Sequence, residues 1–346
     1  MEFREHVPLA PYTTLKIGGP ARWFAEATTE EELVEGVDFA RSHDLRLFAL
    51  GGGSNLLVSD AGFPGLVLHM ALKGIDEDGD GDTCLFSAAA GEDWDAFVDH
   101  AVERNCAGIE CLAGIPGSIG GTPVQNVGAY GQEVSSTIDS VRAYDTVSRR
   151  FVRLSNSECG FRYRQSVFNT RAPGRYIVTS VSYRLTSDAT ATVRYKDLVD
   201  YFTGRPRPGL ADTSRAVREI RRRKGMVITP GDPDSRSAGS FFKNPVVDVA
   251  VLERLRLSHP ELQGQVPSYP AGDDMVKIPA AWLLEQAGFY KGYELGQAGI
   301  SHRHTLALIN RGNATAAEIG ELRDEIKRAV MEKFDIVLEP EPVWVG

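Results

Sequence analysis

The chain has 346 residues, of which 42% are hydrophobic and 25% are charged, and its formal net charge is -9. This composition is typical of a globular protein with about two or three domains. An acidic chain repels nucleic acid, so we expect no nucleic-acid partner and infer that local cations bind any anionic ligand.

The first ten residues lack an apolar signal-peptide region, and no run of about 18 apolar residues occurs. We therefore expect a cytoplasmic protein without a membrane partner.

The first helix and the first strands are predicted near the N-terminus. Thr28 and Thr29 each precede a glutamate by three residues, and Leu33, Val37 and Ala40 follow at helical spacing. This pattern predicts a capped helix. Apolar runs in residues 45–60 and 65–70 are interrupted by a glycine triplet, which favours a βαβ-like opening unit.

An acidic stretch at residues 76–82 resembles the start of a calcium loop. The twelfth position of that loop is Ser87, where calcium binding requires a bidentate glutamate. We therefore expect a solvated hairpin turn between two strands. The pattern provides no reason to predict calcium there.

The four cysteines are Cys84, Cys106, Cys111 and Cys159, and they form no C-x-x-C pair. No histidine lies near them at the spacing of metal ligands. We expect reduced thiols and no metal site.

Strands and helices are also predicted in the later parts of the chain. Residues 145–154 and 175–185 alternate between apolar and polar side chains, as half-buried strands do. The segment from Thr213 to residue 225 reads as a helix that ends in cations. Thr315 and Glu318 have the spacing of a capping box at the start of another helix. The middle of the chain is therefore predicted to be α+β with antiparallel strands.

Glycine is concentrated in residues 113–133, which contain Gly114, Gly117, Gly120, Gly121, Gly128 and Gly131. Glycine lets main-chain amides approach phosphate oxygens and supplies the positive φ angles of an anion-binding nest. The segment is neither a Walker A loop nor a G-x-G-x-x-G fingerprint. By spacing alone, a pyrophosphate site and a structural cluster of turns both remain open.

A second glycine segment, residues 51–57, follows an apolar strand and contains Ser54 and Asn55, which can bond a phosphate or ribityl group. Residues 17–20 add a third turn with two glycines. Convergence of these turns predicts one extended dinucleotide cofactor.

The order of motifs along the chain resembles the UDP-N-acetylenolpyruvoylglucosamine reductase (MurB) family. The motifs that carry this resemblance span nearly the whole chain and are LKIGGPA, GGGSNLLVSD, AGIPGSIGGTPVQNVGAYGQE, YRQSVF, GSFFKNP, KIPAAWLLEQAG and LEPE. The resemblance implies an α+β FAD-binding fold of the vanillyl-alcohol-oxidase type plus a third, substrate-binding α+β domain. It implies bound FAD, NADPH as co-substrate, a UDP-sugar substrate and a role in peptidoglycan synthesis.

The same resemblance suggests a division of the chain. Residues 1–72 and 73–222 would form the two parts of the FAD-binding unit, and residues 223–335 would bind substrate. Residues 336–346 would return to the active site. We expect a monomer.

The family's catalytic positions match Ser240, Arg164 and Glu341. The resemblance implies that Ser240 protonates the α carbon after hydride reaches the β carbon of an enolpyruvyl ether. Arg164 would stabilise the developing enolate, since a cation in a closed site acts strongly on developing charge. Glu341 would stabilise the enol, with burial holding it partly protonated. Without the resemblance, a turn residue and a surface acid would be the simpler readings of Ser240 and Glu341.

The predicted cofactor and substrate residues follow from the glycine segments and from the matched motifs. The cofactor set is Gly51, Gly52, Gly53, Ser54, Asn55, Gly114, Pro116, Gly117, Ser118, Ile119, Gly120, Gly121, Asn126, Gly128 and Ala129. The substrate set is Tyr163, Tyr195, Lys224, Lys243, Asn244, Lys277 and His304. Tyr195 matches a tyrosine that closes over the substrate diphosphate in the longer subtype of the family.

Two other functions remain open from the residues. A flavin oxidase of the same fold would use oxygen as acceptor, but it needs a base where this chain offers a proton donor. A catalytically silent flavin or UDP-sugar binding protein is the second alternative. Candidates at all three catalytic positions favour the reductase.

Overall fold

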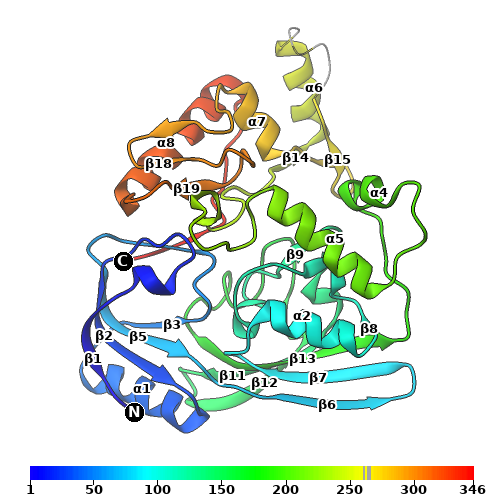
Figure 1. Cartoon of the computed structure of the whole chain (residues 1–346). Helices are drawn as coiled ribbons and strands as arrows, with labels where there is room; N and C mark the ends of the chain where they lie inside the picture. The colour runs from blue at the N-terminus through cyan, green and yellow to red at the C-terminus, as the bar shows by residue number, and fades with distance from the viewer. Residues whose placement is uncertain (260–261, 263–265) are drawn as a thin grey trace.

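A computed structural model describes residues 1–259, 262 and 266–346 of the chain (Figure 1). Its helices are α1 Glu30–Ser42, α2 Trp94–Glu103, α3 Asn156–Cys159, α4 Lys196–Phe202, α5 Leu210–Arg223, α6 Val249–Ser258, α7 Ala280–Gln286 and α8 Ala316–Phe334. The strands of the first half are β1 Arg4–Pro8, β2 Pro20–Ala27, β3 Leu47–Leu50, β4 Leu56–Val58, β5 Phe63–Met70, β6 Ile75–Asp80, β7 Thr83–Ala89, β8 Cys106–Ala107, β9 Gly128–Ala129, β10 Gln132–Glu133, β11 Ile138–Asp145 and β12 Arg150–Ser155. Those of the second half are β13 Tyr176–Ser187, β14 Val246–Asp248, β15 Tyr269–Pro270, β16 Met275–Lys277, β17 Glu294–Leu295, β18 Ala298–Ile300, β19 Leu308–Asn310 and β20 Val343–Val345.

The N-terminal sheet has the strand order β1-β2-β5-β3, and β5 pairs in parallel with both β2 and β3. Helix α1 links β2 to β3, and its N-cap Thr29 accepts a hydrogen bond from the amide of Glu32. The apolar stripe Leu33, Val37 and Ala40 packs on the strands and is buried. The predicted capped helix and βαβ-like opening unit are confirmed.

A larger antiparallel sheet follows, with the strand order β12-β11-β13-β7-β6 and β8 paired to β13. Strands β6 and β7 form a hairpin, but the predicted turn is shorter than expected: residues 76–80 of the acidic stretch belong to β6, and the turn is residues 81–82. Residues 150–154 of the first alternating segment lie in β12, after a turn at 146–149, and residues 176–185 of the second lie in β13. Helices α2 and α5 lie above this sheet in Figure 1, and the aromatic residues Trp94 and Phe97 of α2 pack on Tyr183. The predicted α+β character is confirmed.

The expectation of four reduced cysteines is wrong, because Cys84 and Cys106 form a disulfide. Strand β13 pairs with both β7 and β8, so it brings these two cysteines to a Cα–Cα distance of 6.4 Å. A sequence separation of 22 residues gives no sign of this proximity. Cys111 and Cys159 are free and buried, and burial raises the pKa of each thiol to about 12.

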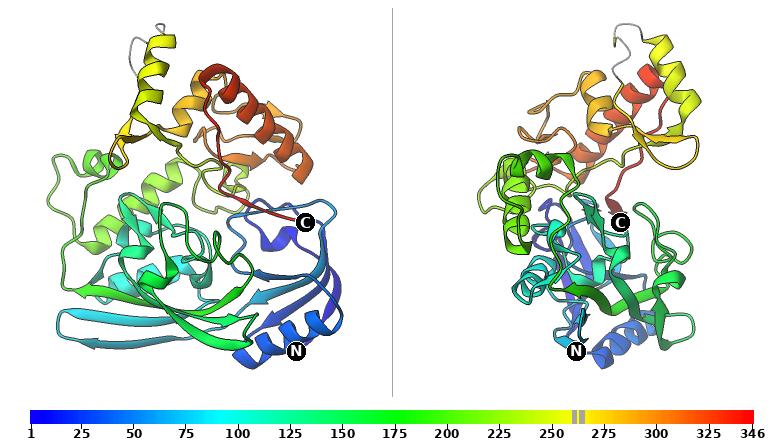
Figure 2. Two further views of the ribbon diagram at one scale, coloured as in Figure 1. Left: turned by 180° about the vertical axis from the view of Figure 1, so that it is seen from behind. Right: turned by 90° about the vertical axis from the view of Figure 1, so that its right-hand side faces the viewer.

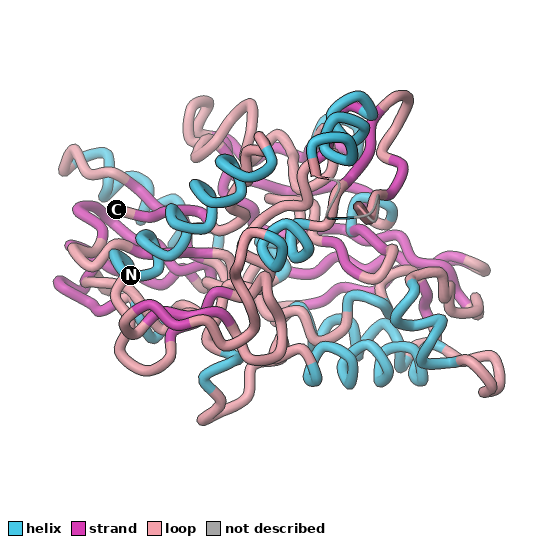
Figure 3. The backbone as a smooth tube through the Cα atoms, turned by 90° about the horizontal axis from the view of Figure 1, so that it is seen from above, coloured by secondary structure: helices cyan, strands magenta, loops and turns pink. Residues whose placement is uncertain are grey.

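The C-terminal part holds the small sheets β14-β16-β15 and β17-β18-β19 with helices α6, α7 and α8. Helix α8 begins at the predicted capping box of Thr315 and Glu318. After α8 the chain descends towards the N-terminal sheet, as Figure 2 shows from behind. There β20 pairs in parallel with β4. Seen from above, loop segments occupy the middle of the molecule (Figure 3).

No helix in the described part of the chain is long and apolar enough to cross a bilayer.

Candidate active site

Two of the predicted glycine turns meet directly. The amide of Gly52 donates to Ser118 Oγ at 3.1 Å, and a Cβ at Gly52 would lie 2.7 Å from the Gly117 backbone. Gly53 has a φ of 62°, and a Cβ there would lie 1.8 Å from Tyr12 O. Side chains are therefore excluded where the two turns approach each other.

This turn pair fits the diphosphate of a dinucleotide. The amides of Gly53 and Ser118 lie at buried residues, and among the described residues they donate to no protein group. Buried amides require a partner, and an anion in a nest of main-chain amides supplies one. The residues present therefore suit an FAD diphosphate.

Other residues of the predicted cofactor set have structural partners. The side chain of Asn126 is buried, donates to Glu133 Oε2 at 2.8 Å and to Arg162 O at 3.1 Å, and accepts from the amide of Ser135 at 3.0 Å. Its amide group is thus used to hold the loop in place. The amide of Gly114 donates to Asp95 Oδ1 at 2.5 Å.

The remaining members of this set lie along the same loop. Ile119 is buried, Gly120 packs closely on Ala90, and a Cβ at Gly121 would meet no heavy atom within 4 Å. Gly128 and Ala129 form strand β9, which pairs with β10. Their contacts with a cofactor, and those of Gly51, Ser54 and Pro116, stay predictions.

Arg164 lies between the cofactor loop and the C-terminal segment. Its Nη2 donates to Gly128 O at 2.8 Å, and its Nε lies 3.2 Å from Glu341 Oε2. The side chains of Arg164 and Glu341 are 18% and 10% exposed, so the ion pair is largely screened from water. The guanidinium also lies 5.2 Å from the ring centre of Tyr163, and Lys277 Nζ lies 4.2 Å from that same ring.

Glu341 and Ser240 are brought together by main-chain pairing. The amide of Glu341 donates to Phe241 O at 2.8 Å, and the amide of Lys243 donates to Glu339 O at 2.9 Å. The half-buried Ser240 is thereby placed next to the residue that pairs with Glu341. Arg164 and Glu341, which are far apart in the sequence, are therefore in contact, and Ser240 lies one residue from the main-chain partner of Glu341.

Burial raises the pKa of Glu341 above its ordinary value, although the nearby cations Arg164 and Lys243 oppose the shift. A carboxyl in such surroundings keeps its proton to a higher pH than one in water. It can therefore act as a hydrogen-bond donor at a site where negative charge develops.

Asn55 connects the first glycine turn to Glu341. Its side-chain Nδ2 donates to Glu341 O at 3.0 Å and to Gln125 Oε1 at 2.5 Å. Its main-chain carbonyl accepts from the amide of Val343 at 2.9 Å. The sequence predicted a cofactor contact for this side chain. The structure shows it holding the C-terminal segment against the turn.

The predicted substrate residues form two groups. Lys224 lies 2.5 Å from Asp197 and faces the ring of Tyr130, which in turn packs edge-on against the exposed Tyr195. The pKa of His304 is lowered to about 4 by burial, then by the charges of Lys224, Lys291 and Arg221.

The second group lies near Glu341 and helix α7. Lys243 Nζ lies 3.0 Å from Glu339. The Oδ1 atom of Asn244 accepts from the amide of Ala280 at 2.9 Å. The side-chain oxygen of Asn244 thus caps the start of α7, and any contact of this residue with a substrate stays a prediction.

Arg221 was missed by the sequence analysis. Its guanidinium donates to Gly114 O and Met226 O, each at 3.0 Å, and both acceptors are main-chain carbonyls. Burial lowers its pKa. A buried cation of this kind suits an anionic ligand beside the second glycine turn.

A weak signal for Arg221 exists in the sequence. It lies four residues after the buried Val217 on the apolar face of α5, whereas Arg222 and Arg223 point elsewhere. In the sequence, the run of three arginines looks like one exposed cationic helix end, so the buried position of Arg221 was not recognised.

Comparison with known proteins agrees with the geometry. Residues 232–345 match the profile of the UDP-N-acetylenolpyruvoylglucosamine reductase C-terminal domain, and residues 21–150 match an FAD binding domain. A reductase of this name from Thermobifida fusca is 46% identical over 99% of this chain and 98% of its own. The chain belongs to the UDP-N-acetylenolpyruvoylglucosamine reductase family. The predicted family, the FAD-binding fold and the FAD cofactor are confirmed.

Other members of this reductase family agree. The Streptomyces coelicolor reductase is 44% identical and covers 98% of this chain and 89% of its own. The crystal structure of the Thermus caldophilus reductase (MurB) has a TM-score of 0.66 at 28% identity, with 100% of both chains covered.

Proposed function

We propose that the chain reduces UDP-N-acetylglucosamine enolpyruvate to UDP-N-acetylmuramate, with NADPH as electron source, in peptidoglycan synthesis. The observation that carries this proposal is the convergence of Arg164, Glu341 and the Ser240 segment beside the paired glycine turns. Bound FAD, reduced by NADPH, supplies the hydride that the β carbon of the enolpyruvyl group accepts.

Arg164 stabilises the negative charge that then spreads over the α carbon and its carboxylate. A donor aimed at developing charge in a site with little water contributes about 3 kcal/mol. The link from Arg164 to Gly128 O fixes the guanidinium in place before the substrate arrives. The positive φ of 56° at Arg164 fits such a constrained position.

Ser240 donates the proton to the α carbon, a step that is downhill once the enolate has formed. Glu341 donates a hydrogen bond to the enol or its carboxylate, which its raised pKa permits. The tie from Asn55 to the Glu341 carbonyl aligns the acid with the cofactor loop.

The UDP-sugar binds through the cations near the junction of α5 and the C-terminal part. Lys224, Arg221 and Lys277 provide positive charge in an otherwise acidic chain, and Tyr195 closes over the diphosphate. The division into residues 1–72, 73–222, 223–335 and 336–346 belongs to this proposal. It is supported by the hydrophobic clusters, which largely follow these boundaries.

The test is Ser240→Ala, with Ser258→Ala on the exposed end of α6 as its matched control. We expect both proteins to be yellow and to be bleached by NADPH. Anaerobic addition of the enolpyruvyl sugar should restore colour in the control, while turnover of Ser240→Ala falls about 10²–10⁴-fold.

Three results count against the proposal. A colourless protein argues against bound flavin, and undiminished turnover in Ser240→Ala removes its role as proton donor. Equal reoxidation by oxygen and by the sugar favours the flavin oxidase.

A further inference from the structure

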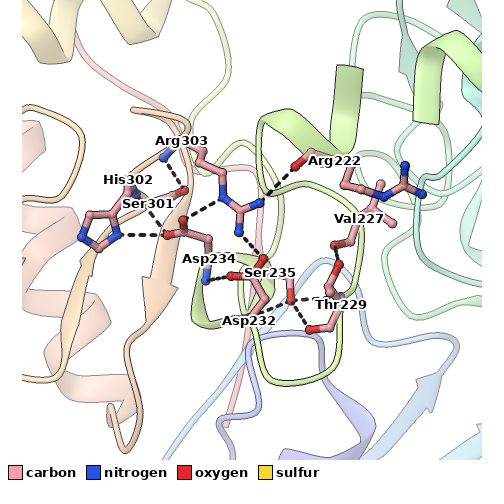
Figure 4. A network of polar contacts seen from close by, with 9 residues as sticks. All are labelled: Arg222, Val227, Thr229, Asp232, Asp234, Ser235, Ser301, His302 and Arg303. Carbon is pink, nitrogen blue, oxygen red and sulfur yellow. Dashed lines mark hydrogen bonds and ion pairs between the residues drawn. The ribbon is translucent and has the colours of Figure 1, made fainter. Parts of the chain in front are cut away.

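A polar cluster away from the three catalytic side chains joins segments on both sides of the junction between α5 and the C-terminal part (Figure 4). These segments are the last turn of α5, the loop of residues 225–239 that leads to Ser240, and the turn of residues 301–305 between β18 and β19. Arg303 lies at the centre of the cluster.

The guanidinium of Arg303 uses three nitrogen atoms for three different acceptors. Its Nε donates to Asp234 Oδ2 at 2.9 Å, its Nη1 donates to Arg222 O at 3.1 Å, and its Nη2 bonds Asp232. The Arg222 carbonyl belongs to the C-terminal end of α5, where a cation is favoured. The planar guanidinium of Arg303 therefore links the 301–305 turn both to the end of α5 and to the 225–239 loop.

The loop that receives this fork is itself held tightly. Asp234 Oδ1 accepts from the amide of His302 at 3.0 Å, and the ring Nδ1 of His302 lies 3.3 Å from the same oxygen. Burial alone would raise the pKa of Asp234, but Arg303 and His302 lower it, so the carboxylate stays charged. Ser235 Oγ donates to Thr229 O at 3.1 Å and closes the loop.

The cluster lies directly behind two predicted substrate residues. Lys224 follows Arg222 by two positions, and His304 follows Arg303 by one. Burial lowers the pKa of His304, and the charges of Lys224, Lys291 and Arg221 lower it further, to about 4. Like charges repel, so contacts from neighbouring segments help to fix where these cations lie.

We infer that Arg303 is a positioning residue: by fastening the end of α5 to the 301–305 turn, it sets the spacing of Lys224 and His304 for the substrate diphosphate. This role rests on the proposed function, since it assigns these two side chains to the UDP-sugar. Arg303 itself need not touch the ligand. The Ser240 segment has separate anchors, because Thr14 Oγ1 donates to Ser237 O at 2.6 Å and the amide of Phe241 donates to Leu306 O at 2.8 Å.

The test compares Arg303→Gln and Arg303→Lys with the matched control Arg311→Gln. Arg311 lies in the same part of the chain, pairs with Glu294 and donates to Gly296 O at 2.9 Å. The probe is UDP-N-acetylglucosamine, whose binding to the oxidised holoenzyme requires no turnover. We expect both Arg303 variants to bind it about tenfold more weakly, because a small misplacement of binding groups has a large effect.

Kinetics and stability separate positioning from a structural role. The KM for the enolpyruvyl sugar should rise with the probe's dissociation constant, while kcat stays within about threefold and FAD content is unchanged. A lower melting temperature with unchanged probe binding and KM would show a merely structural clamp and overturn the inference. If Arg303→Lys bound the probe as tightly as wild type, the inference would also be overturned, because a positive charge without the three-way guanidinium contact would then be enough for binding.

If Arg303→Gln does not fold, Asp232→Asn provides the second variant, because it removes the negative charge of one partner of the fork while keeping the side chain's shape. It should weaken probe binding in the same direction, and unchanged binding would contradict the role of Arg303. Failure of the wild-type protein to reduce the sugar, with the probe effect intact, would remove the proposed reaction and leave the positioning role in place.

Discussion

Glu341 shows how the surroundings of a single residue decide its chemistry. In the sequence it is one acid in an acidic C-terminal stretch, between two prolines. In the structure its carboxyl is nearly enclosed and lies beside Arg164. Desolvation favours the neutral acid and the guanidinium favours the carboxylate, and desolvation is the larger effect.

The pH dependence of the second half-reaction follows from this balance. Because the folded pKa of Glu341 is raised, the protonated form is present below that pKa and is lost as pH increases through it. We expect the rate of sugar-dependent flavin reoxidation in wild type to fall over that range. In Glu341→Gln this fall should be absent and the rate lower at every pH, because an amide does not titrate.

Stopped-flow measurements of reoxidation from pH 5 to pH 9 check this prediction. Reduction by NADPH in the same proteins is the control and should keep its pH profile. An unchanged profile for reoxidation in Glu341→Gln would mean that another group titrates.

At the scale of elements, turns rather than helices or strands form the candidate cofactor site. The first turn follows β3, and the second lies between α2 and β9. Their main chains come too close for side chains, as the Gly52 and Gly53 positions show. The strands and helices supply the rigid frame from which these turns project.

The substitution Gly53→Ala tests whether the close main-chain contact at this turn is needed for FAD binding, with Gly209→Ala as the control. Alanine at residue 53 would need a φ of 62° and would bring its Cβ to 1.8 Å from Tyr12 O, so the turn must move. Residue 209 has open space around it and a φ of -79°.

We expect Gly53→Ala to lose most of its bound FAD and Gly209→Ala to keep it, as measured by the absorbance ratio of flavin to protein after gel filtration. Alanine at the strained position should also reduce the free energy of unfolding by more than about 1 kcal/mol. Full FAD occupancy in Gly53→Ala would contradict the role assigned to this turn.

At the scale of the whole molecule, two cations of the proposed substrate site lie where α5 meets the C-terminal part. Lys224 comes from just after α5, and Arg221 from the buried face of α5. In an acidic chain, this junction is where an anionic group finds concentrated positive charge. NADPH and the UDP-sugar both carry a diphosphate, so we expect them to use this region in turn.

Steady-state kinetics test whether NADPH and the UDP-sugar occupy the same region in turn. Initial rates at several fixed NADPH concentrations should give parallel lines in double-reciprocal plots, and high concentrations of the sugar should inhibit competitively against NADPH. Intersecting lines without substrate inhibition would indicate that both ligands bind at once, at separate places.

Much of this protein could be predicted from local patterns. The capped helices at Thr29 and Thr315, the strands of the middle sheet and the glycine turns depend on neighbouring residues, whose types restrict the backbone directly. The ordered motifs identified the family and predicted three catalytic positions. These features survive in the structure because local preference and tertiary packing agree.

Tertiary structure alone decided which distant groups meet. The Cys84–Cys106 disulfide depends on the pairing of two strands with β13, and the buried state of Arg221 depends on how α5 packs beside Gly114. The bond from Asn55 to Glu341 joins residues 286 positions apart. Partners so remote are chosen by the packing of the whole chain, which no local pattern records.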